Sequence, residues 1–585
     1  MRFLLGYGSC GIAAGAEPVA AALATALAGS GHTMEKVGCL GLCFAEPMLQ
    51  WVDDNGNSVY YGHLTPEATT SLCKGLLAGN IPDQNRLTED ELSFLTGQTR
   101  IALRHCGLID PEQLPAYEAV GGYTALRKAL SDTPEKVIET IKISGLRGRG
   151  GAGFPTWRKW QAARDAVGET KYIVCNADEG DPGAFMDRSL LEGDPHSVLE
   201  GMMLAGYAVG ASEGLLYVRA EYPLAVRRLQ IAMDDLRAAG MLGQNILGSD
   251  FSFDFRMLKG AGAFVCGEET ALLASLEGGR GMPRPKPPFP AQSGYHGFPT
   301  NINNVETFAN VPWILERGGE AFAAMGTADS KGTKVFALAG KVRRGGLVEV
   351  PMGLTLRQIV FDICGGIRDG RPLKGVQIGG PSGGCLPVSL LDTPIDYASI
   401  GATGAIMGSG GLVVMDDTTC MVDMARFFME FTSNESCGKC APCRVGTTRM
   451  KEILDRICDG GGQPGDMEKL RDLGESIVQS ALCGLGNSAP NPVLTTMRYF
   501  PEEYMAHIDQ HACPALSCKA LISYRIVPEK CVGCSLCSRK CPTSAISGEP
   551  KKPYTVDAEK CIACGACRAA CRFDAVTAYS GEAAV

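Results

Sequence analysis

The chain has 585 residues, of which 45% are hydrophobic, and its formal net charge is −9 at pH 7. Domains usually contain roughly 100–200 residues, so we expect several domains rather than one core. The acidic balance and the lack of a dense run of Lys and Arg exclude nucleic acid as the leading partner class. No stretch approaches the roughly 20 uninterrupted apolar residues of a membrane span, so no membrane span is expected.

The N-terminal residues 1–80 are predicted to form a small α/β domain. A strand is expected over 2–8, a helix over 17–31 and a β-hairpin over 48–64, because "DNGN" lies between two β-rich runs. The opening "MRFLLGYGSC" can also be interpreted as a lipoprotein signal, but its apolar run is short and broken by glycine. The polar segment 81–116 is predicted to be a linker.

Residues 117–330 alternate helical patterns with strands such as "KYIVCNA" (171–177) and "EGLLYVRA" (213–220). This alternation predicts an α/β core. Residues 331–415 follow as a strand, a turn, a strand and one helix, which indicates a separate β-rich domain.

The last third of the chain is organised around cysteines. Helices are expected over 416–510, followed by a short segment of mixed His and Cys at 511–523 and a cysteine-dense tail at 524–585. Most of the 25 cysteines follow C-x-x-C or C-x-x-x-C spacing, which suits metal sites more than disulfides. Such thiolates survive best in a reducing cytosol, so a cytoplasmic protein is expected.

The tail carries the strongest metal-binding pattern. Its runs "CVGCSLCSRKC" and "CIACGACRAAC" have the spacing of two-cluster ferredoxins, in which the fourth cysteine of each run binds the other cluster. Paired zinc sites are the weaker alternative, because their C-x-x-C pairs are usually separated by a long gap. The spacing predicts two [4Fe–4S] clusters, one held by Cys531, Cys534, Cys537 and Cys571, the other by Cys561, Cys564, Cys567 and Cys541.

A further cluster is indicated by "ESCGKCAPCR", which supplies Cys437, Cys440 and Cys443. Three thiolates leave a [4Fe–4S] cluster one ligand short. Cys483 lies in a glycine-bounded turn, "ALCGLGNSAPNP", and is the expected fourth ligand.

The N-terminal domain carries an incomplete pattern. Cys10, Cys39 and Cys43 suggest a [2Fe–2S] cluster, but Gly15 stands where a fourth thiolate is wanted. A bound cluster and a cluster-free thioredoxin-like domain both stay open, with Cys73 as a conceivable substitute that looks like an inward-packing helical residue.

The segment "HIDQHACPALSC" offers His507, His511, Cys513 and Cys518. Mixed histidine and thiolate ligands favour zinc, and we expect His507, Cys513 and Cys518 to bind it with an undefined fourth ligand. A plain turn is the alternative. Isolated cysteines are expected to pack as small hydrophobic residues, namely Cys106, Cys175, Cys364 and Cys385.

The stretch "GLRGRGGAGFPTWRKW" (145–160) contains G-x-G-x-x-G at Gly148, Gly150 and Gly153. A Rossmann loop requires a strand before the glycines, whereas "TPEKVIETIKIS" has a helical period. The loop still predicts an anion site, because it has accessible N–H groups, basic side chains and a helix starting near Pro155. A flexible hinge with solvated basic residues is the alternative. Two acidic, glycine-rich segments, "CNADEGDPGAFMDR" and "GAGAFVCGEETALLASLEG", add carboxylates suited to ribose hydroxyls and a flavin ring.

Together, "GRGGAGFPT", "NADEGDPG", "GEETAL", "RPKPPFP", "NNVET" and "ESCGKCAPCR" resemble the family of flavin-containing, NADH-oxidising subunits of respiratory complex I over about residues 121–504. With both terminal domains, the layout is similar to the beta subunits of soluble NAD(P)-linked [FeFe]-hydrogenases, including electron-bifurcating ones. The resemblance implies an α/β multidomain chain. Its parts would be a thioredoxin-like domain, a Rossmann-like FMN and NADH core, a β-grasp-type insert, a helical bundle with a [4Fe–4S] cluster and a two-cluster ferredoxin domain.

The resemblance also implies site residues, position by position. The FMN site would contain Gly148, Arg149, Gly150, Lys159, Asn176, Asp178, Glu268, Asn303 and Asn304. The nicotinamide nucleotide would contact Phe154, Glu179, Asp181, Glu269, Lys286 and Phe289. Trp157 and Ala162 depart from the family pattern, which often has glycine and an aromatic residue there.

The implied activity is electron exchange between NAD(H), FMN and a chain of iron–sulfur clusters. No side chain need act as acid or base, although Glu179 would lie nearest the chemistry. The carboxylates Glu179, Asp181, Glu268 and Glu269 would repel a ribose 2′-phosphate, which favours NAD(H) over NADP(H).

The implied partners are a thioredoxin-like [2Fe–2S] small subunit, a large iron–sulfur subunit of hydrogenase or formate dehydrogenase type, and soluble ferredoxin. A quinone-linked NADH dehydrogenase, a simple ferredoxin-type electron carrier and a zinc-rich scaffold are the alternatives.

Overall fold

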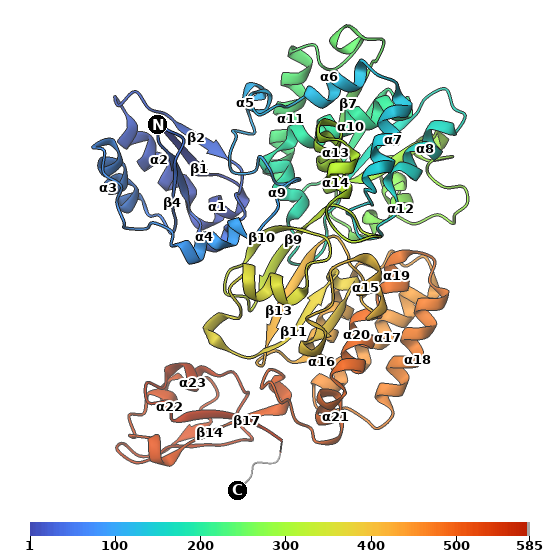
Figure 1. Cartoon of the computed structure of the whole chain (residues 1–585). Coiled ribbons are helices and arrows are strands. Elements are labelled where there is room, and N and C mark those ends of the chain that lie inside the picture. Colours follow the sequence, from blue (N-terminus) through green and yellow to red (C-terminus); the bar gives the residue numbers. More distant parts are fainter. Residues whose placement is uncertain (582–585) are drawn as a thin grey trace. The chain divides into compact units, whose positions relative to one another are not determined.

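The computed structural model describes residues 1–581 (Figure 1). Its contacts divide the chain into two units. The first contains Met1–Gly370, Gln377–Gly380 and Ser389–Val414, and the second contains Arg371–Val376, Pro381–Val388 and Met415–Val585. Within the described part, no helix is both long and apolar enough to cross a membrane.

The N-terminal domain of the first unit is built on a four-stranded sheet of order β2-β1-β3-β4. Helices α2 and α3 pack against each other beside this sheet. The predicted hairpin is confirmed, because Asp53 Oδ1 accepts hydrogen bonds of 2.8 Å from the backbone N–H groups of Asn55 and Asn57 in its turn. The elements are β1 (Arg2–Gly6), α1 (Ser9–Ala14), α2 (Ala16–Leu27), β2 (Met34–Val37), β3 (Leu49–Val52), β4 (Ser58–Tyr61) and α3 (Pro66–Leu77).

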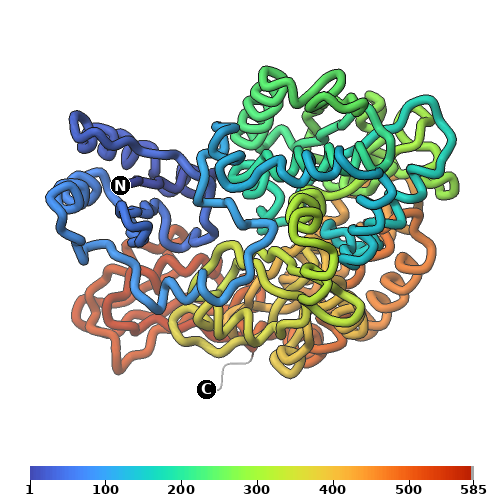
Figure 2. Tube along the Cα trace, turned by 45° about the horizontal axis from the view of Figure 1, so that its top comes forward, coloured from blue at the N-terminus to red at the C-terminus, as the bar shows by residue number. Residues whose placement is uncertain are grey.

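The segment predicted as a linker, 81–116, is folded instead. Helix α4 (Glu89–Thr96) begins with a capping box between Thr88 and Glu91. Beyond it, the buried Glu349 carboxylate accepts 2.9 Å hydrogen bonds from the N–H groups of residues 101, 102 and 103. The Cα trace, coloured by residue number, passes from the N-terminal domain through this lighter blue segment into the core (Figure 2). A polar connector is expected to be flexible when nothing in the fold holds its backbone. Here the distant Glu349 holds it by hydrogen bonds.

The core of the first unit is a parallel four-stranded sheet of order β7-β6-β5-β8. It confirms the two strands predicted at 171–177 and 213–220, and helix α10, hydrophobic around its circumference, is buried along nearly all its length. The strands are β5 (Tyr172–Ala177), β6 (Glu213–Arg219), β7 (Asp254–Gly260) and β8 (Thr300–Asn304). The helices are α5 (Leu114–Ala119), α6 (Thr124–Leu130), α7 (Pro134–Ser144), α8 (Thr156–Asp165), α9 (Met186–Gly193), α10 (Pro195–Val209), α11 (Pro223–Ala238), α12 (Glu269–Leu276), α13 (Val305–Arg317) and α14 (Gly319–Ala323).

The strand order identifies where a ligand fits. The chain proceeds outward from β5 through β6 to β7 and then returns to place β8 on the other side of β5. In open parallel sheets, ligands bind at the carboxyl ends of strands where the order reverses. That point lies between the ends of β5 and β8.

The β-rich segment begins with the predicted hairpin, in which β9 (Thr333–Gly340) pairs antiparallel with β10 (Gly346–Pro351). Strand β13 (Gly411–Asp416) pairs parallel with β9. The predicted helix is a π-helical turn at Gln358–Ile363. The remaining elements are β11 (Leu373–Ile378), β12 (Gly384–Pro387) and α15 (Tyr397–Ala402).

From Met415 onward, the second unit contains the expected helices, which end at Asp509 close to the predicted limit. The tail that follows pairs β14 (Ile522–Ile526) antiparallel with β17 (Val576–Ser580), so its two ends lie side by side (Figure 1). Its short inner elements are β15 (Ile546–Ser547), β16 (Thr555–Val556), α22 (Leu536–Lys540) and α23 (Ala566–Ala570). The preceding helices are α16 (Met421–Asn434), α17 (Ala441–Cys458), α18 (Asp466–Ser480), α19 (Gly484–Ser488), α20 (Asn491–Tyr499) and α21 (Pro501–Asp509).

Candidate active site and metal centres

The glycine loop follows a helix, as expected, and not a strand. Helix α7 ends at Ser144, and the loop closes on itself through hydrogen bonds from Gly148 N to Phe154 O (2.9 Å) and from Thr156 N to Leu146 O (3.0 Å). Gly153 has φ +61°, and a Cβ there would lie 2.5 Å from the ring of Tyr397. Only glycine fits this close approach with a left-handed backbone.

The loop lies over the carboxyl ends of β5 and β8. Asn176 of β5 is in register with Asn304 of β8, and a Cβ on Gly150 would lie 3.1 Å from Asn304 Cβ. Helix α8 starts directly after the loop at Thr156. The free N–H groups at a helix start favour anions, and this helix start lies at the reversal point of the sheet.

The predicted asparagines fix this edge of the sheet. Asn176 Nδ2 donates to Gly267 O at 3.0 Å, which holds the acidic segment before α12. Asn303 Oδ1 accepts from Trp160 Nε1 of α8 at 2.9 Å. Asn304 Oδ1 caps α13 by accepting from Glu306 N at 2.9 Å. These contacts place β5, β8 and α8 around one position.

A chain of alternating charges lies beside the loop. Glu269 forms ion pairs with Lys159 (3.1 Å) and Lys286 (2.9 Å), and Lys286 also pairs with Glu268 at 3.2 Å. Burial alone would raise the pKa of Glu269, but the two lysines outweigh it and hold that pKa below its usual value. Glu268 Oε2 caps α12 by accepting from the N–H groups of Thr270 and Ala271.

Two of the predicted site residues, Glu179 and Arg149, form hydrogen bonds within the protein. The Glu179 carboxylate accepts from Asp187 N (3.0 Å) and Arg188 N (3.1 Å), and burial raises its pKa. Arg149 is fully buried, and its guanidinium donates to carbonyl oxygens of residues 147 and 331. The motif match therefore identified both positions but not their contacts. Glu179 binds the backbone at the start of α9, and Arg149 stabilises the glycine loop.

The remaining predicted nucleotide residues differ in exposure. Phe154 and Phe289 are 47% and 53% exposed, so each presents ring surface for stacking. Asp178 is buried in the turn after β5. Burial raises the pKa of Asp181 to about 6, although Ser409 Oγ donates to its carboxylate at 2.6 Å. Trp157, which departs from the family pattern, packs against the core with Arg158 over its ring.

The cysteine cluster of the helical bundle forms around the start of α17. Cys443 lies in the first turn of α17, and Ser436 Oγ is 3.2 Å from its Sγ. A Cβ on Gly486 of α19 would lie 3.6 Å from the same Sγ, so the turn that begins with Cys483 approaches Cys443. Burial, together with the nearby thiols of Cys440, Cys483 and Cys437, raises the pKa of Cys443. The structure thus brings the expected fourth ligand to the other three.

The ferredoxin-like tail contains two small cavities, each lined by four cysteines. One is lined by Cys541, Cys561, Cys564 and Cys567, and the other by Cys531, Cys534, Cys537 and Cys571. In each set three thiols come from one run and the fourth from the other. This is the crossed arrangement predicted from the spacing, and each set has four thiols, the number that one cubane cluster requires.

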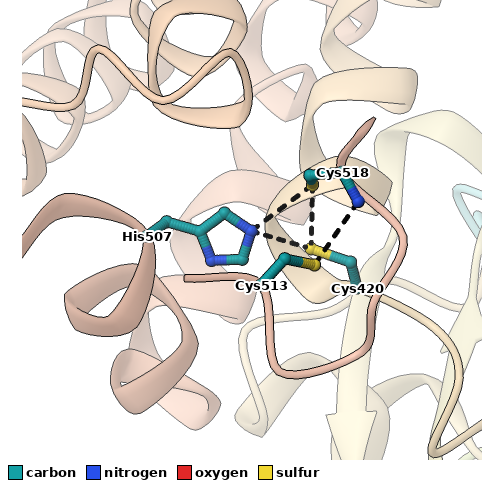
Figure 3. Close-up of side chains that lie close together, drawn as sticks. All are labelled: Cys420, His507, Cys513 and Cys518. Atoms are coloured by element: carbon teal, nitrogen blue, oxygen red, sulfur yellow. Dashed lines mark hydrogen bonds between the residues drawn. The ribbon is translucent and has the colours of Figure 1, made fainter. Parts of the chain in front are cut away.

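The predicted zinc segment gains its fourth ligand from a distant helix start. His507 Nε2 lies 3.4 Å from the Sγ atoms of both Cys420 and Cys518, and those two Sγ atoms are 3.7 Å apart (Figure 3). Cys513 completes a buried set whose ligand atoms all lie within 4.8 Å of one another. His507 Nδ1 is 2.7 Å from the Glu503 carbonyl oxygen, the kind of contact that orients a metal-binding imidazole. The donor set and spacing fit one tetrahedral zinc ion.

The three expected ligands all belong to this set, and the fourth, left undefined by the sequence, is Cys420 and not His511. His511 is exposed and is not part of the buried set. Cys420 was missed, because it lies 87 positions before His507 and belongs to no C-x-x-C pair. Its one local signal is its place as the N-cap of α16, where its Sγ accepts from Asp423 N.

The N-terminal cysteines also converge. The Sγ atoms of Cys10, Cys39 and Cys43 lie within 4.8 Å of one another. Glu46, which sequence reasoning missed, lies beside them with Oε1 3.7 Å from Cys10 Sγ, and burial raises its pKa to about 7. Cys73 packs into the hydrophobic core of the domain, so it does not replace the missing thiolate. The cysteines predicted to be isolated are all buried, namely Cys106, Cys175, Cys364 and Cys385.

Comparison with known proteins assigns the core. Residues 141–313 match the family model of the Nuo51 FMN-binding domain, and residues 423–507 match that of the NADH-ubiquinone oxidoreductase-F iron-sulfur binding region. Over 415 residues the chain is 47% identical to an NADH-quinone oxidoreductase subunit of Rhizobium meliloti (strain 1021), and the match covers 71% of this chain and 99% of that protein. The chain belongs to the Nuo51 family.

Other members of the Nuo51 family match a larger share of the chain. The chain is 58% identical over 479 residues to "NADP-reducing hydrogenase subunit HndC" of Solidesulfovibrio fructosivorans, covering 82% of this chain and 98% of that protein. It is 38% identical over 488 residues to "NAD-reducing hydrogenase HoxS subunit alpha" of Cupriavidus necator, covering 82% and 77% respectively.

A solved NAD+-reducing [NiFe]-hydrogenase in the H2-reduced state is similar with a TM-score of 0.63 and 30% identity, over 87% of this chain and 84% of that chain. Residues 530–575 of the tail match the model of a 4Fe-4S dicluster domain. This member of the Nuo51 family is therefore an FMN- and [4Fe–4S]-binding protein, as predicted.

Proposed function

We propose that this chain is the flavin and iron–sulfur subunit of a multisubunit oxidoreductase that exchanges electrons with NAD(H). The observation that carries the proposal is the convergence of the glycine loop, the start of α8 and the ends of β5 and β8 at one edge of the parallel sheet. When bound there, FMN supplies the conversion between two-electron hydride chemistry and single electrons. Residues of this chain bind and orient the reacting groups.

The loop N–H groups and the start of α8 would hold the FMN phosphate. Asn176, Asn303 and Asn304 fix the strand ends beneath it, and Lys159 brings positive charge from α8. Phe154 and Phe289 offer exposed rings for the nicotinamide nucleotide. No step requires a side chain to give or take a proton, and the Glu179 carboxylate is held by backbone N–H groups.

The flavin assignment is tested with Gly150→Val. The new side chain would push the loop away from Asn304, so we expect flavin per chain to fall severalfold while iron per chain stays unchanged. Gly401→Ala is the matched control, because a Cβ there meets open space. Normal flavin content in Gly150→Val would contradict the proposed FMN site at the glycine loop.

NAD(H) is the proposed nucleotide. A second candidate, NADP(H), is favoured by the pairing of Glu268 and Glu269 with lysines, which weakens the expected repulsion of a 2′-phosphate. The name of the 58% identical relative also points to NADP. Measuring steady-state kcat/KM for NADH and for NADPH tests this choice. A strong preference for NADPH would reject NAD(H) as the nucleotide.

We also propose three [4Fe–4S] clusters and a zinc ion held by Cys420, His507, Cys513 and Cys518. The zinc proposal is tested by Cys420→Ser, which should lower zinc by one ion per chain and leave iron unchanged. Cys385→Ser is the control, because Cys385 is buried and is not a member of the zinc set. Equal zinc in both variants would reject the site.

We also propose a cytoplasmic complex with a large iron–sulfur subunit of hydrogenase type and a thioredoxin-like [2Fe–2S] small subunit. The hydrogenase names of two relatives, which match beyond the central core, support this choice over a formate dehydrogenase or quinone-linked partner. Electron bifurcation with soluble ferredoxin is part of the same proposal. Identifying the large subunit that co-purifies with the chain tests it, and a formate dehydrogenase subunit would reject it.

A further inference from the structure

The thiols of the N-terminal domain are packed too closely for a two-iron cluster. Cys10 Sγ, Cys39 Sγ and Cys43 Sγ all lie within 4.8 Å of one another, and the Cys39–Cys43 pair is 3.7 Å apart. In a [2Fe–2S] cluster each iron holds two thiolates, so a third thiolate belongs to the other iron and lies farther away. Three mutually close sulfurs instead match one ion, because a tetrahedral Zn–S site has sulfur–sulfur edges of about 3.8 Å.

Other sites of the same chain provide an internal comparison. Among the described residues, two groups of at least three metal-type ligand atoms converge within 4.8 Å: this triad and the Cys420, His507, Cys513 and Cys518 set. The cysteines of the three expected [4Fe–4S] sites, where every thiolate binds a different iron, do not converge so closely in the described part. The triad therefore has the spacing of a single-ion site.

Within residues 1–581, no cysteine supplies a fourth thiolate to this triad. Gly15 ends α1 with φ +104°, and a Cβ built on it meets nothing within 4 Å. A carboxylate lies beside Cys10 instead, although its oxygens are not within 4.8 Å of all three thiols. Glu46 is 8% exposed, its Oε1 lies 3.7 Å from Cys10 Sγ, and a tetrahedral zinc site with one oxygen has a sulfur–oxygen edge of about 3.6 Å.

The surroundings of Glu46 are shaped for a carboxylate. A Cβ on Gly11 would lie 3.0 Å from Glu46 Oε2, and a Cβ on Gly6 would lie 3.1 Å from both oxygens. Met48 N donates to Oε2 at 3.1 Å, which leaves Oε1 toward Cys10. Within residues 1–581 no Lys, Arg or His side chain forms an ion pair with Glu46. A buried carboxylate without a basic partner either takes up a proton or coordinates a cation.

We propose that Cys10, Cys39 and Cys43 bind one zinc ion in place of a [2Fe–2S] cluster, and that the Glu46 carboxylate moves toward the ion as its fourth ligand. Zinc has no redox chemistry, so the N-terminal domain would carry no electrons in this protein. The ion would instead fix the 39–43 loop. That loop follows Gly38, where a Cβ would lie only 2.3 Å from Gly193 Cα at the end of α9. The site goes beyond the proposed function, which does not depend on it.

The first test is metal analysis of the full chain carrying Cys39→Ser and Cys43→Ser together. Zinc should fall by one ion per chain, while iron and the electron paramagnetic resonance spectrum of the reduced protein stay unchanged. Cys73→Ser is the matched control in the same domain, because Cys73 is buried outside the triad. Loss of two iron ions with their signal and no loss of zinc would overturn the proposal, and so would unchanged zinc and iron.

A milder variant covers the case in which the double variant fails to fold. Glu46→Gln keeps the shape of the side chain but removes its charge, so one zinc ion should pass to a competing chelator at least about tenfold faster. Glu35→Gln is the control, because Glu35 pairs with Arg2 away from the triad. Release as slow as in the control would overturn Glu46 as the fourth ligand.

Discussion

At the scale of single residues, the proposed flavin site depends on charges that the protein itself neutralises. Glu269 is paired with two lysines, and Glu179 is held by backbone N–H groups. Sequence motifs identified these positions, but residue type alone cannot tell whether a carboxylate faces a ligand or an internal partner. The internal partner can lie far along the chain. Arg188, whose N–H binds Glu179, is 9 positions away, and Lys159, which pairs with Glu269, is 110 positions away.

The buried pair of Lys334 in β9 and Glu306 in α13 gives the first prediction. Both side chains are almost completely buried, and Glu306 also accepts from Val335 N. Lys334→Met leaves a buried carboxylate without its cation, so the free energy of unfolding should fall by about 3–5 kcal/mol. Tryptophan-monitored thermal unfolding measures the loss. Adding Glu306→Gln should restore most of it, and a double variant as unstable as the single one would contradict this explanation.

Asp181 gives a prediction about pH. Burial raises its pKa to about 6 from the ordinary value of 3.8 in the unfolded chain, so folding becomes less favourable as pH rises between these values. Asp181→Asn removes that cost, which is about 1 kcal/mol larger at pH 7.5 than at pH 5.

The gain in melting temperature from Asp181→Asn should therefore be greater at pH 7.5. Asp329→Asn, at an exposed position, serves as the control. A gain that does not change with pH would show that Asp181 is ionised as easily as a free carboxyl.

At the scale of elements, regular periodicity and local spacing predicted most of what the structure contains. The strands at 171–177 and 213–220 and the N-terminal hairpin are confirmed, because each depends on residues close in sequence. The tail cysteines line two cavities in the predicted crossed sets, and their binding of two clusters stays a prediction. The folded segment after residue 81 and the contribution of Cys420 were missed. Both depend on a partner far along the chain, Glu349 in one case and His507 in the other.

The crossed ligands of the tail predict a specific pattern of non-additivity. Cys571→Ala should remove about four iron ions per chain, and adding Cys531→Ala should remove no more, because both residues bind one cluster. Adding Cys561→Ala instead should remove about four more. Iron analysis of the three variants measures this, and the reverse pattern would mean that each run binds its own cluster.

At the scale of the whole molecule, each proposed site is complete within one unit. The predicted FMN and nucleotide residues all belong to the first unit, and all ligands of the three expected [4Fe–4S] clusters belong to the second. Fold comparison alone would not assign an activity, because one fold can host many functions. The assignment depends on the glycine loop at the sheet edge together with the cysteine sets, and both lie in regions that match family models.

The proposed function requires that electrons pass from NADH through FMN to the iron–sulfur clusters of this chain. Anaerobic titration of the purified protein with NADH, followed by visible absorption, tests this most directly. We predict a spectrum of flavin plus a broad iron–sulfur band, and both components should bleach as NADH is added. Iron–sulfur absorption that NADH leaves unchanged, in protein that retains its flavin, would contradict the proposed electron path.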